Sequence, residues 1–260
     1  MLRDILPRVH ELRDLIEEPN EISAYFRDFD NSILNDPSGD LKMRVWLKYE
    51  LEYQRLDKDS WECLKDEAEV YLTKPDPKGL RGWQQLITIL NQARGYIYLV
   101  GIGCSKVMFI PRQKRKTHPK KSGKTPDLQG TFRDGRLVLC EVKTLNRSVK
   151  EVERFNNKEV GEIKNRLEPG FLETKLKGAI NEAKNQLTLY NADQNVRRIV
   201  YIIPNFDNLL GEYKTEYYEQ IDQHLRDYID PDLEVVFHNE QGPFFRWIVM
   251  ENAVVVNETF

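Results

Sequence analysis

The stretch that most constrains the fold is TPDLQGTFRDGRLVLCEVKT, residues 125–144. It places two runs of strand-forming residues on either side of Asp134-Gly135, a pair typical of tight hairpin turns. The second run is almost continuously apolar, which favours a buried strand, yet it contains Glu141 and Lys143. Because unpaired charges are costly in a buried strand, this hairpin is also the first candidate for a functional site.

The register of the hairpin decides whether its acidic residues meet. With a two-residue turn, Asp127 lies opposite Val142 and therefore on the wrong face of the sheet. With a three-residue loop over Arg133–Gly135, whose glycine is left-handed, Asp127 pairs with Glu141 on one face. We predict the second register, or a compensating bulge near Gly130.

Two carboxylates beside an ammonium group form a site for a hard cation. Asp127 and Glu141 would supply oxygen ligands, which Mg²⁺ prefers together with water molecules. Lys143 projects to the same face as Glu141, because strand side chains alternate. An ammonium group in that place can orient or deprotonate an attacking water and offset phosphate charge.

Other metal and membrane signals are missing from the sequence. Three cysteines form no CxxC pair and four histidines form no HExxH motif, so a metal site would be built from carboxylates. The sequence has no apolar run of about 18 residues and its first thirty residues are charged throughout, so we expect no membrane span, no secretory signal and a cytoplasmic protein.

The pattern of apolar residues divides the chain in two. Three- and four-residue spacing predicts helices over residues 1–73, and the Pro/Gly break KPDPKG follows at 74–79. We therefore predict a helical N-terminal region over 1–75 and a second domain over 76–260. In that domain we expect strands in GYIYLVGIGCSKVMFIP, residues 95–111, because it is rich in β-branched and aromatic residues.

Farther along the second domain, strands and helices alternate. A long helical region over about 147–190 is followed by a strand over 196–204, a helix near 216–229 and closing strands from 233 onward. Together with the hairpin, this order predicts an α/β fold, a mixed β-sheet flanked by helices, with the N-terminal helices as an extension.

Pro126-Asp127 followed by Glu141-x-Lys143 resembles the PD-(D/E)xK nuclease superfamily. The predicted elements over about 80–205 follow the order of that family's core. The resemblance implies a restriction endonuclease-like fold in which Asp127 and Glu141 bind Mg²⁺ or Mn²⁺ and Lys143 acts on the water.

A second motif lies on the helix that follows the hairpin. QLTLY places Gln186 and Tyr190 four residues apart, and so on one helix face. It resembles the QxxxY element of RecB-type exonucleases, in which the glutamine and the tyrosine help to position the scissile strand.

One family feature is missing, because many members supply a further glutamate from the helix before the first strand. Here the helix over 80–94 has no acidic residue. Four residues are candidates to replace that glutamate: Gln84, Gln85, Glu67 and Glu69. A one-metal site built from Asp127, Glu141 and the Val142 carbonyl is the alternative.

Directly before Asp127, the segment RQKRKTHPKKSGK, residues 112–124, has seven basic residues and no acidic one. Such density is typical of phosphate-backbone contacts. The candidate contacts are Arg112, Lys114, Arg115, Lys116, Lys120, Lys121 and Lys124. Acidic residues outnumber basic ones over 1–75 and the reverse holds in the rest of the chain, which also favours a polyanionic partner for the second domain.

These patterns lead to a first hypothesis, a Mg²⁺-dependent nuclease that hydrolyses DNA, with RNA left open, in a restriction, defence or repair role. The alternative is a catalytically weak or inactive module of the same fold that binds nucleic acid or a partner protein. A third hypothesis places the main function in the acidic N-terminal helices, which could also bind a partner or form a homodimer.

Overall fold

The computed structural model describes residues 2–16, 26, 29–35, 39–73, 81–111, 125–146, 166–167, 170–204, 214–226, 232–238 and 245–247. Contacts divide the chain into two compact units, Met1–Ile102 and Gly103–Phe260. The domain boundary predicted at residue 75 lies outside the described residues. Within the described residues, no helix combines the length and the apolar character needed to cross a bilayer.

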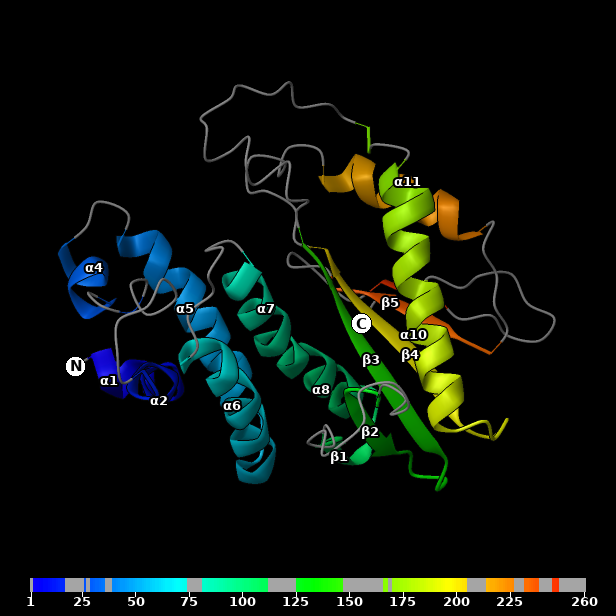
Figure 1. Ribbon diagram of the computed structural model, residues 1–260, viewed down its shortest axis with the longest axis horizontal. Helices are drawn as coiled ribbons and strands as arrows, with labels where there is room; N and C mark the ends of the chain where they lie inside the picture. Colours follow the sequence, from blue (N-terminus) through cyan, green and yellow to red (C-terminus); the bar gives the residue numbers. More distant parts are fainter. Residues whose placement is uncertain are drawn as a thin grey trace. The chain divides into compact units, whose positions relative to one another are not determined.

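All the regular elements described in the first unit are helices (Figure 1). Its helices are α1 (Leu2–Ile5), α2 (Pro7–Asp14), α4 (Phe29–Asn35), α5 (Gly39–Tyr53), α6 (Lys58–Thr73), α7 (Arg81–Leu90) and α8 (Gln92–Gly101). The described part of residues 1–73 is therefore helical, as the apolar spacing predicts.

Aromatic side chains form much of the interior of this unit. Ring contacts run from Phe26 to Trp46 (centroids 5.3 Å apart), on to Tyr49 (5.7 Å) and Tyr53 (5.9 Å), and from Tyr53 to Trp61 (5.1 Å). Such pairs contribute stability beyond the apolar area that they bury. The aromatic series joins α5 to α6 and to the residues before α4.

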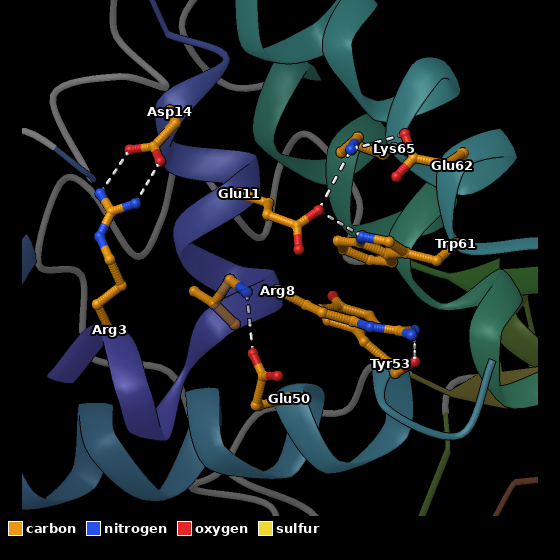
Figure 2. A network of polar contacts seen from close by, with 10 residues as sticks. Arg3, Arg8, Glu11, Asp14, Glu50, Tyr53, Trp61, Glu62 and Lys65 are labelled. Atoms are coloured by element: carbon orange, nitrogen blue, oxygen red, sulfur yellow. Dashed lines mark hydrogen bonds and ion pairs between the residues drawn. The ribbon is translucent and has the colours of Figure 1, made fainter. Parts of the chain in front are cut away.

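Polar contacts fix α2 against the same helices (Figure 2). The Arg8 guanidinium donates to the carbonyl of Tyr53, the last residue of α5, and to the carbonyl of Leu56, three residues farther on. It also lies over the ring of Trp61, with its Cζ 5.1 Å from the ring centroid. The Trp61 Nε1–H donates to Glu11 Oε2 (2.7 Å). Arg8 therefore joins α2 to two backbone carbonyls at and just beyond the C-terminus of α5.

Replacing Arg8 by alanine is expected to destabilise the first unit by about 1–3 kcal/mol, because it removes the two hydrogen bonds and the cation–π contact. Urea denaturation followed by tryptophan fluorescence measures the change. The control is Arg3→Ala, which removes an exposed ion pair with Asp14 and should shift the midpoint little. Equal midpoints for the Arg8 and Arg3 variants would contradict the prediction.

The prediction of a strand over residues 95–101 is wrong, because these residues belong to α8 (Gln92–Gly101). Every residue from 92 to 99 is buried, so no polar face reveals the helical period, and a short apolar run of this kind cannot be distinguished from a strand. The charged side chain of Arg94 is also buried, and it forms an ion pair with Glu52 of α5, with Arg94 Nε 3.0 Å from Glu52 Oε2.

The second unit is built on a mixed β-sheet with the strand order β1-β2-β3-β4-β5-β6. The strands are β1 (Ser105–Phe109), β2 (Leu128–Thr131), β3 (Leu137–Leu145), β4 (Arg197–Pro204), β5 (Glu234–Phe237) and β6 (Phe245–Trp247). The pairs β3–β4 and β4–β5 are parallel, and the other pairs are antiparallel.

Two helices pack on one face of this sheet, α10 (Lys177–Tyr190) and α11 (Lys214–Arg226); α10 is preceded by a π-helical segment, η1 (Phe171–Leu176). Their apolar residues, such as Leu187 and Ile221, share a buried cluster with Leu139 on β3 and Val200 on β4. The predicted mixed sheet flanked by helices is thus found in the second unit.

The β2–β3 hairpin has the register that a three-residue loop predicts. Leu128 pairs with Cys140 and Thr131 with Leu137, and the next step of this register places Asp127 opposite Glu141. Gly135 has φ +85°, a left-handed conformation that glycine adopts without strain. The hairpin therefore brings the two acidic residues to the same face of the sheet.

Candidate functional site

Glu141 and Lys143 lie on the face of β3 that is turned toward α10. Strand side chains alternate, so these two residues share a face with Leu139 and Leu145, which pack in the cluster formed with α10. The Glu141 side chain is almost fully buried, with 4% of the residue exposed. A buried carboxylate requires partners, and α10 and β3 supply them.

Asp127 reaches the same place from the start of the hairpin. It is buried in a bend just before β2. Its Oδ2 accepts a hydrogen bond from the Val142 N–H (2.9 Å), and its carbonyl accepts one from the Ile110 N–H (2.9 Å). Asp127 is thereby held against the backbone between Glu141 and Lys143.

The carboxylate of Glu141 has a partner on each oxygen. Lys143 Nζ lies 3.0 Å from Oε1, and the Gln186 amide Nε2 donates to Oε2 at 2.7 Å. The same amide nitrogen donates to the Thr125 carbonyl at 2.6 Å. Gln186 thus joins α10 both to β3 and to the segment that leads to Asp127.

Electrostatics keeps Lys143 charged. Burial by itself would lower the pKa of the Lys143 ammonium, but the neighbouring carboxylates, Glu141 foremost and then Glu182 and Asp127, together more than offset this effect. The pKa of Lys143 therefore lies above its ordinary value, and the side chain is an ammonium at neutral pH.

The other residues that the sequence predicts for the site lie in different parts of the chain. Tyr190 is the last residue of α10, one turn after Gln186, and is 42% exposed. The four candidates for the missing helix glutamate lie in the first unit, on α6 and α7: Glu67, Glu69, Gln84 and Gln85. The seven basic residues of 112–124 lie outside the described residues.

Sequence reasoning missed Glu182, which lies on α10 one turn before Gln186. Its Oε2 is 3.8 Å from Lys143 Nζ. The signal was present, because residues four apart share a helix face. The spacing alone does not predict the contact with Lys143, because that contact depends on the packing of α10 against β3.

The donors at this site fit a hard cation that keeps several waters. Among the described residues no group of three or more His, Cys, Asp or Glu side chains is arranged to hold a metal ion, so Asp127 and Glu141 would be the only carboxylate ligands there. Mg²⁺ commonly binds through one or two carboxylates and completes its shell with water. In addition, Gln186 Oε1 is buried and, within the described residues, accepts no hydrogen bond.

Asp127, Glu141, Lys143 and Gln186, four residues singled out from the sequence, are thus linked by direct contacts or by one intervening backbone group. Any functional role for these four residues is inferred from these contacts and from the order of the residues along the chain. A comparison of the chain with protein-family models, with curated proteins and with solved structures finds no match.

Proposed function

We propose that this protein is a metal-dependent nuclease that hydrolyses phosphodiester bonds in DNA. The observation that carries the proposal is the convergence of Asp127, Glu141 and Lys143 on one face of the β2–β3 hairpin, with Gln186 hydrogen-bonded to Glu141. Two carboxylates, an ammonium and an amide in this order and spacing match the PD-(D/E)xK pattern with its QxxxY element.

Asp127 and Glu141 would hold the cation, with the Val142 carbonyl as a further ligand. Mg²⁺ or Mn²⁺, when bound, supplies charge stabilisation on phosphate oxygens and makes a water easier to deprotonate. The protein holds the two carboxylates in place beforehand: the Val142 N–H fixes Asp127, and Gln186 fixes Glu141. Ordered supporting contacts of this kind tune metal affinity and ligand orientation.

Lys143 would act as a hydrogen-bond donor rather than as a base. Its raised pKa keeps the ammonium protonated at neutral pH, so it can orient the attacking water and stabilise the negative charge that develops on the phosphate. Tyr190, exposed one turn beyond Gln186, is the candidate to steady the scissile strand.

We further propose that the second unit has a restriction endonuclease-like fold. It is supported by the antiparallel β1-β2-β3 order, by the parallel pairing of β3 with β4 and by α10, which lies between those two strands in the chain. The basic segment 112–124, immediately before Asp127, would contact the DNA backbone. Restriction, defence and repair are the roles that the resemblance implies.

A second candidate function is a nucleic-acid-binding module without efficient catalysis. The small number of possible metal ligands favours it. Within the described residues, no third His, Cys, Asp or Glu side chain lies with Asp127 and Glu141 in a group that could hold a metal ion. It is also favoured by α7, which has no acidic residue. Both observations weaken a two-metal mechanism and leave a one-metal mechanism intact.

Cleavage assays distinguish the two functions. Supercoiled, linear and single-stranded DNA are incubated with the protein and Mg²⁺, Mn²⁺ or EDTA. A nuclease is expected to cut at least one substrate with either cation and none with EDTA. Salt-sensitive binding without cleavage of any substrate would replace the nuclease by the binding module, and the substrate that is cut would separate endonuclease from exonuclease action.

A further inference from the structure

One face of α10 contacts both charged residues of β3. Gln186 donates to Glu141 Oε2 at 2.7 Å, and Glu182, one turn earlier, has Oε2 at 3.8 Å from Lys143 Nζ. The two helix residues are four apart and share a face. The helix therefore braces the carboxylate with an amide and the ammonium with a second carboxylate.

We propose that Glu182 is a positioning residue that holds the Lys143 ammonium within the site, an inference that rests on the nuclease function proposed above. Glu182 itself is not a proposed metal ligand; its contact in this site is with the Lys143 ammonium. It acts through Lys143, on which it places a second attractive charge from the helix side.

The need for such a residue follows from the side chain of lysine. Lysine carries a point charge on a flexible four-carbon stem, so its position is fixed only by the groups around the ammonium. Glu141 Oε1 supplies one partner at 3.0 Å. That carboxylate is also a proposed cation ligand, and sharing its charge with a cation would weaken its hold on Lys143. Glu182 adds a second carboxylate on the helix side of the ammonium, at 3.8 Å.

The exposure of Glu182 favours a functional role over a structural one. The residue is half exposed, at 50% side-chain accessibility, whereas Lys143 is only 19% exposed. Ion pairs with an exposed partner contribute little to stability. The contact therefore does little for folding, and its distinguishing property is that it reaches the ammonium that faces Glu141.

The chain offers a matched control just before α10. Glu173 lies 3.8 Å from Lys177 Nζ, the same separation, but both side chains are exposed, at 62% and 43%. Glu173→Gln therefore removes a surface ion pair of the same length, together with a 3.5 Å contact to His224 Nδ1, and neither involves Lys143. Unfolding midpoints of all variants establish that the folded protein is being compared.

The test measures the single-turnover rate of DNA cleavage at saturating protein, together with the dissociation constant for the same DNA. Glu182→Gln is expected to lower the rate about three- to fivefold, the range of a partly exposed ion pair, with unchanged DNA affinity. Glu182→Asp should recover part of the loss, and Glu173→Gln should keep the parental rate.

Two results would overturn the role of Glu182 alone: a parental rate in Glu182→Gln, or weaker DNA binding with an unchanged rate at saturation. A loss of the same size in Glu173→Gln would assign the effect to general surface charge and also overturn it. A parent protein that cuts no DNA under any metal condition would instead overturn the nuclease function and this inference together.

Discussion

Replacing Lys143 by alanine is expected to lower the rate of metal-dependent DNA cleavage about 10²–10⁴-fold, the usual range for one proton-handling or charge-stabilising group. Lys143 is the residue that places a positive charge against Glu141 Oε1. Because its pKa is raised, that charge is present at neutral pH. The rate of nicking or digestion of the preferred DNA, measured with saturating Mg²⁺, gives the size of the loss.

The Lys143 variant must be separated from a folding defect, because Glu141 is buried and the variant lacks the ammonium that faces its Oε1. Gln186 still donates to the carboxylate, so the variant should fold. Lys177→Ala serves as the control, since Lys177 is an exposed lysine at the start of α10. Parental cleavage by Lys143→Ala, with an unchanged affinity for DNA, would show that this ammonium has no part in the chemistry.

The register of the hairpin, and with it the approach of Asp127 to Glu141, could be predicted because both depend on local rules. The choice between a two- and a three-residue loop sets which side chains face each other. Gly135, with φ +85°, selects the three-residue loop. From that choice the pairing of Asp127 with Glu141 follows, and the i, i+4 rule adds Gln186 and Tyr190 to one helix face.

Two features could not be predicted because they depend on tertiary burial. Helix α8 is buried along nearly its whole length, so the sequence there lacks the polar stripe that marks a helix. Glu182 is one of many acidic residues on predicted helices, and its contact with Lys143 appears only once α10 packs against β3. In both cases the deciding neighbours are distant in the sequence.

The contacts of Gln186 also refine what its motif implies. The family resemblance assigns this glutamine to the scissile strand, whereas its amide nitrogen donates to Glu141 Oε2 and to the Thr125 carbonyl. It therefore supports the protein's own carboxylate and the segment before Asp127. Its Oε1 is buried and, in the described part of the chain, accepts no hydrogen bond.

Replacing all seven basic residues of 112–124 by glutamine is expected to weaken DNA binding about a thousandfold at low salt. Each neutralised phosphate releases counterions, so the slope of log affinity against log salt should fall by about 0.9 for every phosphate that the variant no longer neutralises. Fluorescence anisotropy with a labelled duplex, over a series of salt concentrations, measures both quantities. An unchanged slope would remove this segment from the DNA interface.

Two double variants that remove the same number of positive charges separate the effect of this segment from the effect of net charge. Lys120→Gln with Lys121→Gln removes two charges from the segment, and Arg55→Gln with Lys58→Gln removes two from exposed positions of the first unit. Only the first pair should lower the salt slope. At saturating protein, the single-turnover cleavage rate of the Lys120/Lys121 variant should stay parental, whereas Lys143→Ala should lose rate without losing affinity. Such opposite effects would show that different residues bind the DNA backbone and cleave the bond. A pure binding module would not produce this result, because it does not cleave DNA. A purely structural ion pair at Lys143 would not produce it either, because its loss would not lower the cleavage rate alone.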